Sequence, residues 1–136
     1  MPMLQIVLKV IAPIFVIVGV LHLALGLSAD VLLGANLPAQ VLSDPVLDSQ
    51  NRFYGVAFSA YGFLFYLCAT DLVKYQAVLR TLLLVFFAAG CARIVSIVLY
   101  GLPSELVILL LALELLLPPI LIIWMGRAIG SQTSIR

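Results

Sequence analysis

Charged residues are scarce in this sequence, since Asp, Glu, Lys and Arg make up 10% of its 136 residues and the formal net charge is +1. A soluble domain usually contains about 25% charged residues, because most of its surface faces water. A net charge this small also provides no electrostatic attraction for nucleic acid or for an acidic protein. The composition therefore argues against an ordinary soluble domain and against a nucleic-acid-binding protein.

Residues that bind metals or form disulfides are also few. His22 is the single histidine, and no suitably spaced cysteine accompanies it to complete a coordination shell. Cys68 and Cys91 lie on different predicted helices at depths that differ by about 10 Å, counted at about 1.5 Å per residue, which is too far for a disulfide. The sequence also lacks nucleotide, zinc and calcium motifs. We therefore expect no metal site and no cofactor.

Hydrophobic residues, in contrast, make up 65% of the chain and gather in four long segments. About 20 apolar residues are needed to cross about 30 Å of hydrocarbon, so each segment has the length of a transmembrane helix. Asp44-Pro45 is typical of a helix start, and Gly101-Leu102-Pro103 is typical of a helix stop and restart. The sequence predicts one all-α domain over residues 1–136, an integral membrane four-helix bundle. The predicted helices cover about residues 10–27, 45–70, 75–100 and 104–124, with an outer loop at 28–44.

The charged residues near the ends of these helices predict an orientation. Basic residues lie at the N-terminus, in the loop between the second and third helices and in the C-terminal tail, and they are Lys9, Lys74, Arg80, Arg127 and Arg136. The other two loops contain Asp30, Asp44, Asp48 and Glu105, with no basic residue before Arg52. Because cytoplasmic loops carry an excess of Lys and Arg, we predict that both termini face the cytoplasm. The outer loop mixes apolar and acidic residues, so it is either an interfacial anchor or a lid over the bundle.

Each predicted helix contains one strongly polar or ionisable residue in the outer half of the membrane: His22, Arg52, Arg93 and Glu114. A charge in the hydrocarbon costs about 2.5–3.5 kcal/mol or more, so such residues usually face a partner or a wet cavity. Serine, tyrosine and glycine share helix faces with the two arginines, which is typical of surfaces that look into a bundle. We therefore predict a pocket that opens to the outer leaflet. Its candidate ligand-binding residues are His22, Arg52, Ser59, Arg93, Ser96, Tyr100 and Glu114.

Structural roles are the alternative for the same residues. Arg93 and Glu114 flank a short helix connection at similar depths, so they are expected to contact each other, and this pair could act only in packing. Arg52 follows Asp48 by one helical turn, which favours a local ion pair. His22 could be a neutral imidazole bonded to a neighbouring helix, with Gly19 allowing a close approach.

Two prolines predict a further backbone feature in the fourth helix. Pro118 and Pro119 have no N–H to donate to the carbonyls of Glu114 and Leu115, so a kink is expected beside the deep carboxylate. Broken helices near the midplane often line binding sites in transporters, although simple kinks are also tolerated.

Several short motifs occur in a defined order along the chain. They are G-x-x-H in the first helix, N-R-F-Y-G at 51–55, T-D-L at 70–72, F-A-A-G-C-A-R-I-V-S at 87–96, G-L-P-S at 101–104, and a glutamate before a Pro-Pro pair and a tryptophan. In these motifs the chain resembles the bacterial four-helix membrane family catalogued as domain of unknown function 4345. The resemblance covers nearly the whole chain and implies a four-span protein of the cell inner membrane. It implies no activity, because the family has none established.

Three classes of function fit these observations. We expect a protein that binds or transports a small amphiphile or lipid, because two arginines suit a polar or anionic head and the apolar helices suit a tail. Transport through so small a bundle would require a dimer. The first alternative is a structural or accessory subunit of a membrane complex. The second is an enzyme that uses Glu114 and His22 on a lipophilic substrate. It is disfavoured because an arginine near Glu114 favours the ionised carboxylate, whereas acid–base catalysis needs a group that exchanges its proton readily.

Overall fold

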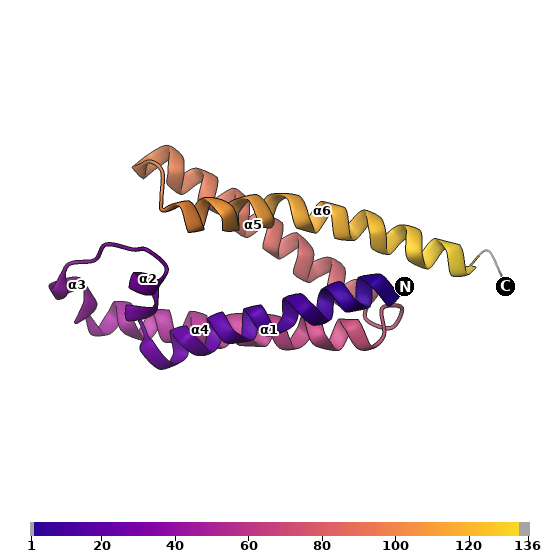
Figure 1. Ribbon diagram of the computed structural model, residues 1–136, viewed down its shortest axis with the longest axis horizontal. Helices are drawn as coiled ribbons and strands as arrows, with labels where there is room; N and C mark the ends of the chain where they lie inside the picture. Colours follow the sequence, from indigo (N-terminus) through magenta and orange to yellow (C-terminus); the bar gives the residue numbers. More distant parts are fainter. Residues whose placement is uncertain (1, 134–136) are drawn as a thin grey trace. The chain divides into compact units, whose positions relative to one another are not determined.

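The structure is a computed structural model that describes residues 2–133, and helices are the regular structure of this described part (Figure 1). Four helices are long and apolar enough to cross a membrane, as the sequence predicts. This confirms the predicted class, an all-α integral membrane protein with four membrane-length helices. In chain order the helices are α1 (Pro2–Leu25), α2 (Ser28–Leu32), α3 (Ala39–Leu42), α4 (Pro45–Thr70), α5 (Gln76–Tyr100) and α6 (Glu105–Thr133).

Most of the predicted helix boundaries agree closely with the structure, but two helices extend further than expected. α1 begins at Pro2 instead of near residue 10, because the apolar residues before Lys9 continue the helix without a break. α6 continues through Pro118 and Pro119 and past Trp124. Arg136, which contributes to the predicted orientation, lies outside the described residues.

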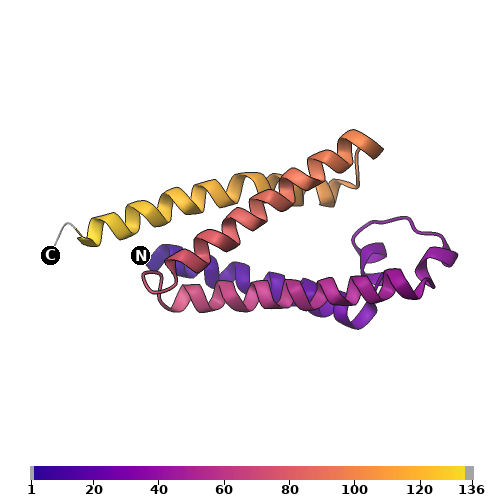
Figure 2. The ribbon, with the colours of Figure 1, turned by 180° about the vertical axis from the view of Figure 1, so that it is seen from behind.

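The chain divides into two compact units, and residues Val10–Leu64 form the first, here called the N-terminal unit. In this unit α1 and α4 run antiparallel and side by side (Figures 1 and 2). Glycine allows their close approach: a Cβ atom on Gly55 would lie 2.5 Å from the backbone nitrogen of Leu23 and 2.7 Å from the carbonyl oxygen of Gly19. A Cβ on Gly62 would lie 2.5 Å from the carbonyl oxygen of Ala12. The predicted close packing at Gly19 is therefore confirmed.

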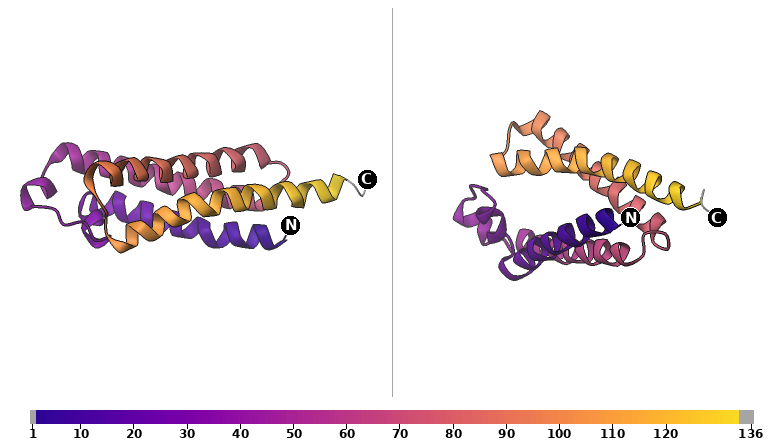
Figure 3. Two further views of the ribbon diagram at one scale, coloured as in Figure 1. Left: turned by 90° about the horizontal axis from the view of Figure 1, so that it is seen from above. Right: turned by 45° about the vertical axis from the view of Figure 1, so that its right-hand side comes forward.

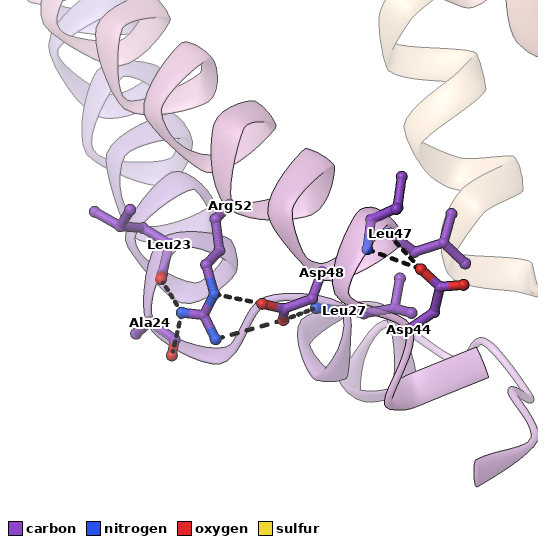
Figure 4. Close-up of polar contacts among 8 residues, drawn as sticks. Leu23, Ala24, Leu27, Asp44, Leu47, Asp48 and Arg52 are labelled. Atoms are coloured by element: carbon purple, nitrogen blue, oxygen red, sulfur yellow. Dashed lines mark hydrogen bonds and ion pairs between the residues drawn. The ribbon is translucent and has the colours of Figure 1, made fainter. Parts of the chain in front are cut away.

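The predicted outer loop, residues 28–44, contains the two short helices α2 and α3 (Figure 3). Gly26 turns the chain out of α1 with a φ of 56°, a left-handed conformation that favours glycine. Asp44 caps α4, since its Oδ1 accepts hydrogen bonds from the backbone N–H groups of Val46 at 2.8 Å and Leu47 at 3.1 Å (Figure 4). This is the N-cap that the Asp44-Pro45 pair predicts.

The second unit, here called the hairpin unit, consists of the chain up to Lys9 together with the chain from Phe65 onward. In this unit α5 and α6 form an antiparallel hairpin, as the short connection at Gly101 predicts (Figure 3). Gly101 ends α5 with a φ of 92°. The apolar core of this unit consists of Leu4, Leu8, Phe65, Cys68, Ala69, Leu72, Leu79, Leu82, Leu83, Leu121 and Met125.

Candidate functional site

An ion pair joins the two helices of the hairpin. Arg93 on α5 donates from Nε to Oε2 of Glu114 on α6 at 2.7 Å, so the predicted contact is confirmed. Glu114 is 4% exposed. Gly90, one turn before Arg93, allows α6 to come close, since a Cβ there would lie 3.0 Å from Cβ of Glu114. A buried carboxylate without a partner is strongly destabilising, so Glu114 fixes the position of the guanidinium.

Arg93 also lines a small cleft at the end of the hairpin that contains the α5–α6 connection. The cleft has a volume of about 70 Å³. Its walls are formed by Arg93, Ser96, Ile97, Gly101, Pro103, Val107 and Leu111. Arg93 and Ser96 are the polar residues of this wall, and the other lining residues are apolar. The cleft therefore combines one cation and one hydroxyl with a hydrophobic wall.

The hydrogen bonding of Arg93 explains why this cation is available to a ligand. Among the described residues, its side-chain hydrogen bond to protein is the one from Nε to Glu114. A guanidinium has five N–H donors in a planar fork, so the two terminal nitrogens retain donor capacity. Its side chain is 35% exposed, compared with 5% for that of Glu114. A planar cation held on one edge in this way suits a carboxylate or phosphate on its other edge.

Arg52 in the N-terminal unit has a different environment (Figure 4). It donates from Nε to Oδ2 of Asp48 at 2.8 Å, which is the predicted local pair. It also donates from Nη1 to the carbonyl oxygens of Leu23 at 2.7 Å and Ala24 at 3.1 Å. These carbonyls lie in the last turn of α1, where a helix has no internal donors left. Arg52 thus caps α1, and each of its three nitrogens has an acceptor in its own chain because Nη2 lies 3.4 Å from Oδ1 of Asp48.

His22 belongs to a second polar cluster in the N-terminal unit. Its Nδ1 lies 2.8 Å from the carbonyl oxygen of Val18, and its Nε2 lies 3.4 Å from Oδ1 of Asp30 on α2. Oδ2 of Asp30 accepts a hydrogen bond from Nδ2 of Asn51 on α4. Asn51 is 9% exposed, and its Oδ1 is buried without a partner among the described residues. A buried acceptor left in this state costs about 1–3 kcal/mol.

The remaining two candidates have simpler surroundings. Ser59 donates to the carbonyl oxygen of Gly55 at 3.0 Å and packs against Gly19, so it helps to join α1 and α4. Tyr100 at the end of α5 is 86% exposed and is not part of the cleft wall. Of the seven candidates, Arg93 and Ser96 share the cleft and Glu114 holds Arg93, whereas His22, Arg52 and Ser59 have partners within the N-terminal unit. One pocket bounded by all seven stays a prediction.

Asp30 and Asn51 are polar residues that sequence reasoning did not assign to a site. Asp30 counted only toward the charge of the outer loops, and Asn51 appeared only within the N-R-F-Y-G motif. A usable signal was present, since Gly26 between His22 and Asp30 allows the chain to fold back after α1. Asn51 also lies on α4 directly before Arg52, at the level where α1 ends.

Comparison with known proteins places the chain in a family. Neither the curated proteins nor the solved structures contain a significant match to it. The family model described as "Domain of unknown function (DUF4345)" matches residues 3–125, which include most of each membrane-length helix and all seven candidate residues. The chain therefore belongs to the DUF4345 family of membrane proteins.

Proposed function

We propose that this protein binds the polar, anionic head of a small amphiphile or lipid in the cleft beside Arg93. The observation that carries the proposal is the contrast between the two arginines. Arg52 uses all three side-chain nitrogens within its own chain, whereas Arg93 is held through Nε and is one of the residues that line the cleft.

The size and lining of the cleft support a head group as the bound part. A volume of about 70 Å³ suits a carboxylate or a phosphate with few further atoms, and it is too small for an acyl chain. Ser96 also lines the cleft, and its hydroxyl is a group that can donate a hydrogen bond. Ile97, Val107 and Leu111 form an apolar wall on which the first methylene groups of a chain can pack. The remainder of the chain would lie in the surrounding bilayer.

Because the protein crosses the membrane several times, an amphiphile in the surrounding bilayer can reach the cleft directly. We propose that the protein lies in the cell inner membrane with both termini in the cytoplasm, since basic residues favour that side. The Gly101 connection and the cleft then lie at the outer leaflet. Binding requires a monomer only, whereas transport would require a homodimer or another membrane protein to complete a path.

The alternative function is that of a structural or accessory subunit of a membrane complex. The observation that favours it is that these charges are neutralised within the chain. Arg52 pairs with Asp48, and Arg93 pairs with Glu114. Under this alternative, the pairs specify helix packing and the cleft stays empty. The two functions therefore differ in whether the purified protein retains an amphiphile or a protein partner.

Native mass spectrometry of the protein purified in mild detergent tests the proposal. We expect a retained adduct with the mass of an amphiphile that has an acidic head. A Leu111→Trp variant should lose the adduct, because the larger indole fills the cleft without removing either charge. Leu113→Trp is the matched control, because Leu113 is an exposed leucine of the same helix outside the cleft. Wild-type protein without an adduct, or with a stoichiometric protein partner in its place, would overturn the proposal in favour of the accessory subunit.

A further inference from the structure

The cluster of His22, Asp30 and Asn51 lies apart from the Arg93 cleft in the chain and connects three elements of the N-terminal unit. His22 is on α1, Asp30 is on α2 and Asn51 is on α4. The carboxylate of Asp30 is the centre of the cluster, since one oxygen faces the imidazole and the other accepts from the amide of Asn51. The only histidine of the chain thus contacts a short helix that follows the membrane span.

The imidazole lies between two groups that accept hydrogen bonds. The carbonyl oxygen of Val18, 2.8 Å from Nδ1, can only accept, so Nδ1 must carry a hydrogen. In a neutral ring Nε2 would then present a lone pair to Oδ1 of Asp30 at 3.4 Å. An ionised carboxylate also presents lone pairs, so the two atoms would repel each other. The contact is favourable only when one proton lies between Nε2 and Oδ1.

We propose that His22 and Asp30 form a proton-binding site, and that the bound proton holds α2 against α1 and α4. With the proton bound, the pair is an imidazolium facing a carboxylate, and every polar atom of the contact has a partner. Loss of the proton leaves two acceptors facing each other and weakens the hold on α2. Asn51 continues to donate to Asp30, so the change is a partial loosening of α2.

The other groups around His22 are compatible with this site. On α4 the ring of Phe58 stacks with the imidazole at a centroid distance of 6.5 Å and brings no titratable group. The charged residues of α4 at this level, Asp48 and Arg52, pair with each other. On α1 the imidazole meets the backbone of Val18, and on α2 it meets Asp30. Asp30 is therefore the ionisable partner of His22 within the described part of the N-terminal unit.

Two measurements on the wild-type protein in lipid nanodiscs test the proposal. Because His22 is the only histidine, nitrogen-15 signals from labelled histidine report its protonation without overlap. Hydrogen exchange of the peptide spanning residues 27–35, corrected for the intrinsic pH dependence of exchange, reports how firmly α2 is held. We expect the protection of α2 to fall about fivefold as His22 loses its proton, as for loss of one partly exposed ion pair. Protection that stays constant while His22 titrates would overturn the proposal.

Variants then test whether Asp30 is the responsible partner. In Asp30→Asn, the fall in α2 protection with rising pH that the wild type shows should be lost. Asp44→Asn is the matched control, because it removes the same charge from the outer loop but caps α4 without touching His22. In His22→Gln, the protection of α2 should no longer change with pH. A pH dependence of α2 protection that survives in the Asp30 variant, or that is equally lost in the Asp44 variant, would overturn the assignment.

Discussion

At the scale of single residues, Arg52 and Arg93 illustrate what spacing can and cannot predict. The turn of helix between Asp48 and Arg52 predicts their pair, and the short connection between α5 and α6 predicts the contact of Arg93 with Glu114; the structure contains both. The capping of α1 by Arg52 could not be predicted from spacing. It depends on the residue at which α1 ends, and therefore on the turn at Gly26.

The ion pair in the hairpin predicts strong energetic coupling. Arg93→Met leaves a buried carboxylate without its partner and should destabilise the protein by about 3–5 kcal/mol. Glu114→Gln should cost less, because the remaining arginine is partly exposed. In the double variant the loss should be smaller than the sum of the two single losses. Unfolding titrations in mixed detergent micelles measure all three values.

Arg80→Met provides the control for this cycle. Arg80 is an exposed arginine of the same helix, so its replacement should change the free energy of unfolding by less than about 0.5 kcal/mol. If the loss of stability in the Arg93 and Glu114 double variant equals the sum of the two single losses, the two side chains do not interact.

At the scale of helices, glycine contacts determine how closely α1 and α4 pack. Gly55→Ala would place a methyl group 2.5 Å from the backbone nitrogen of Leu23, so the helices must separate. We expect a loss of stability of about 1–3 kcal/mol. Gly126→Ala is the matched control, because no atom lies within 4 Å of the position that its methyl group would take and the helix gains about 0.5–1 kcal/mol from alanine. Thermal unfolding in detergent measures the stability of both variants. Equal stability of the Gly55 and Gly126 variants would contradict this packing.

Gly101, at the end of α5, should resist substitution because of its backbone conformation. Gly101 has open space around it but a φ of 92°, so a side chain there meets backbone strain and no steric contact. Gly101→Ala should therefore destabilise the protein by about 1–3 kcal/mol. The same unfolding assay applies, and a variant as stable as Gly126→Ala would indicate that the hairpin turn adopts another conformation.

The helices were predictable largely because hydrophobic length and end signals act locally. Asp44-Pro45 and Gly101 mark helix ends through their own backbone chemistry, so α4 and α5 match the prediction within one residue. The short helices α2 and α3 were not predicted, since their few residues carry no periodic signal. The contact of Asp30 with His22 depends on α2, and for this reason the proton site was also missed.

At the scale of the whole molecule, the distribution of basic residues predicts the orientation in the membrane. A cysteine introduced at Gln40 should react with an impermeant maleimide added outside intact cells, and one introduced at Gly130 should react only after lysis. Both experiments require Cys91→Ser, because Cys91 is exposed. Labelling of the Gly130 position in intact cells would reverse the orientation and place the Arg93 cleft at the inner leaflet.

The most direct test of the Arg93 cleft as an anionic head-group site is a calorimetric titration with two amphiphiles that share one acyl chain. One has a phosphate monoester head and the other an uncharged glycerol head. We expect wild-type protein to bind the phosphate form about tenfold more tightly, since a charge-assisted hydrogen bond contributes about 1.5–3 kcal/mol. The double variant Arg93→Gln/Glu114→Gln, which leaves no unpaired buried charge, should lose this preference, and Arg80→Gln should keep it. Equal affinity of the wild-type protein for both amphiphiles, or a preference that survives in the double variant, would contradict the account.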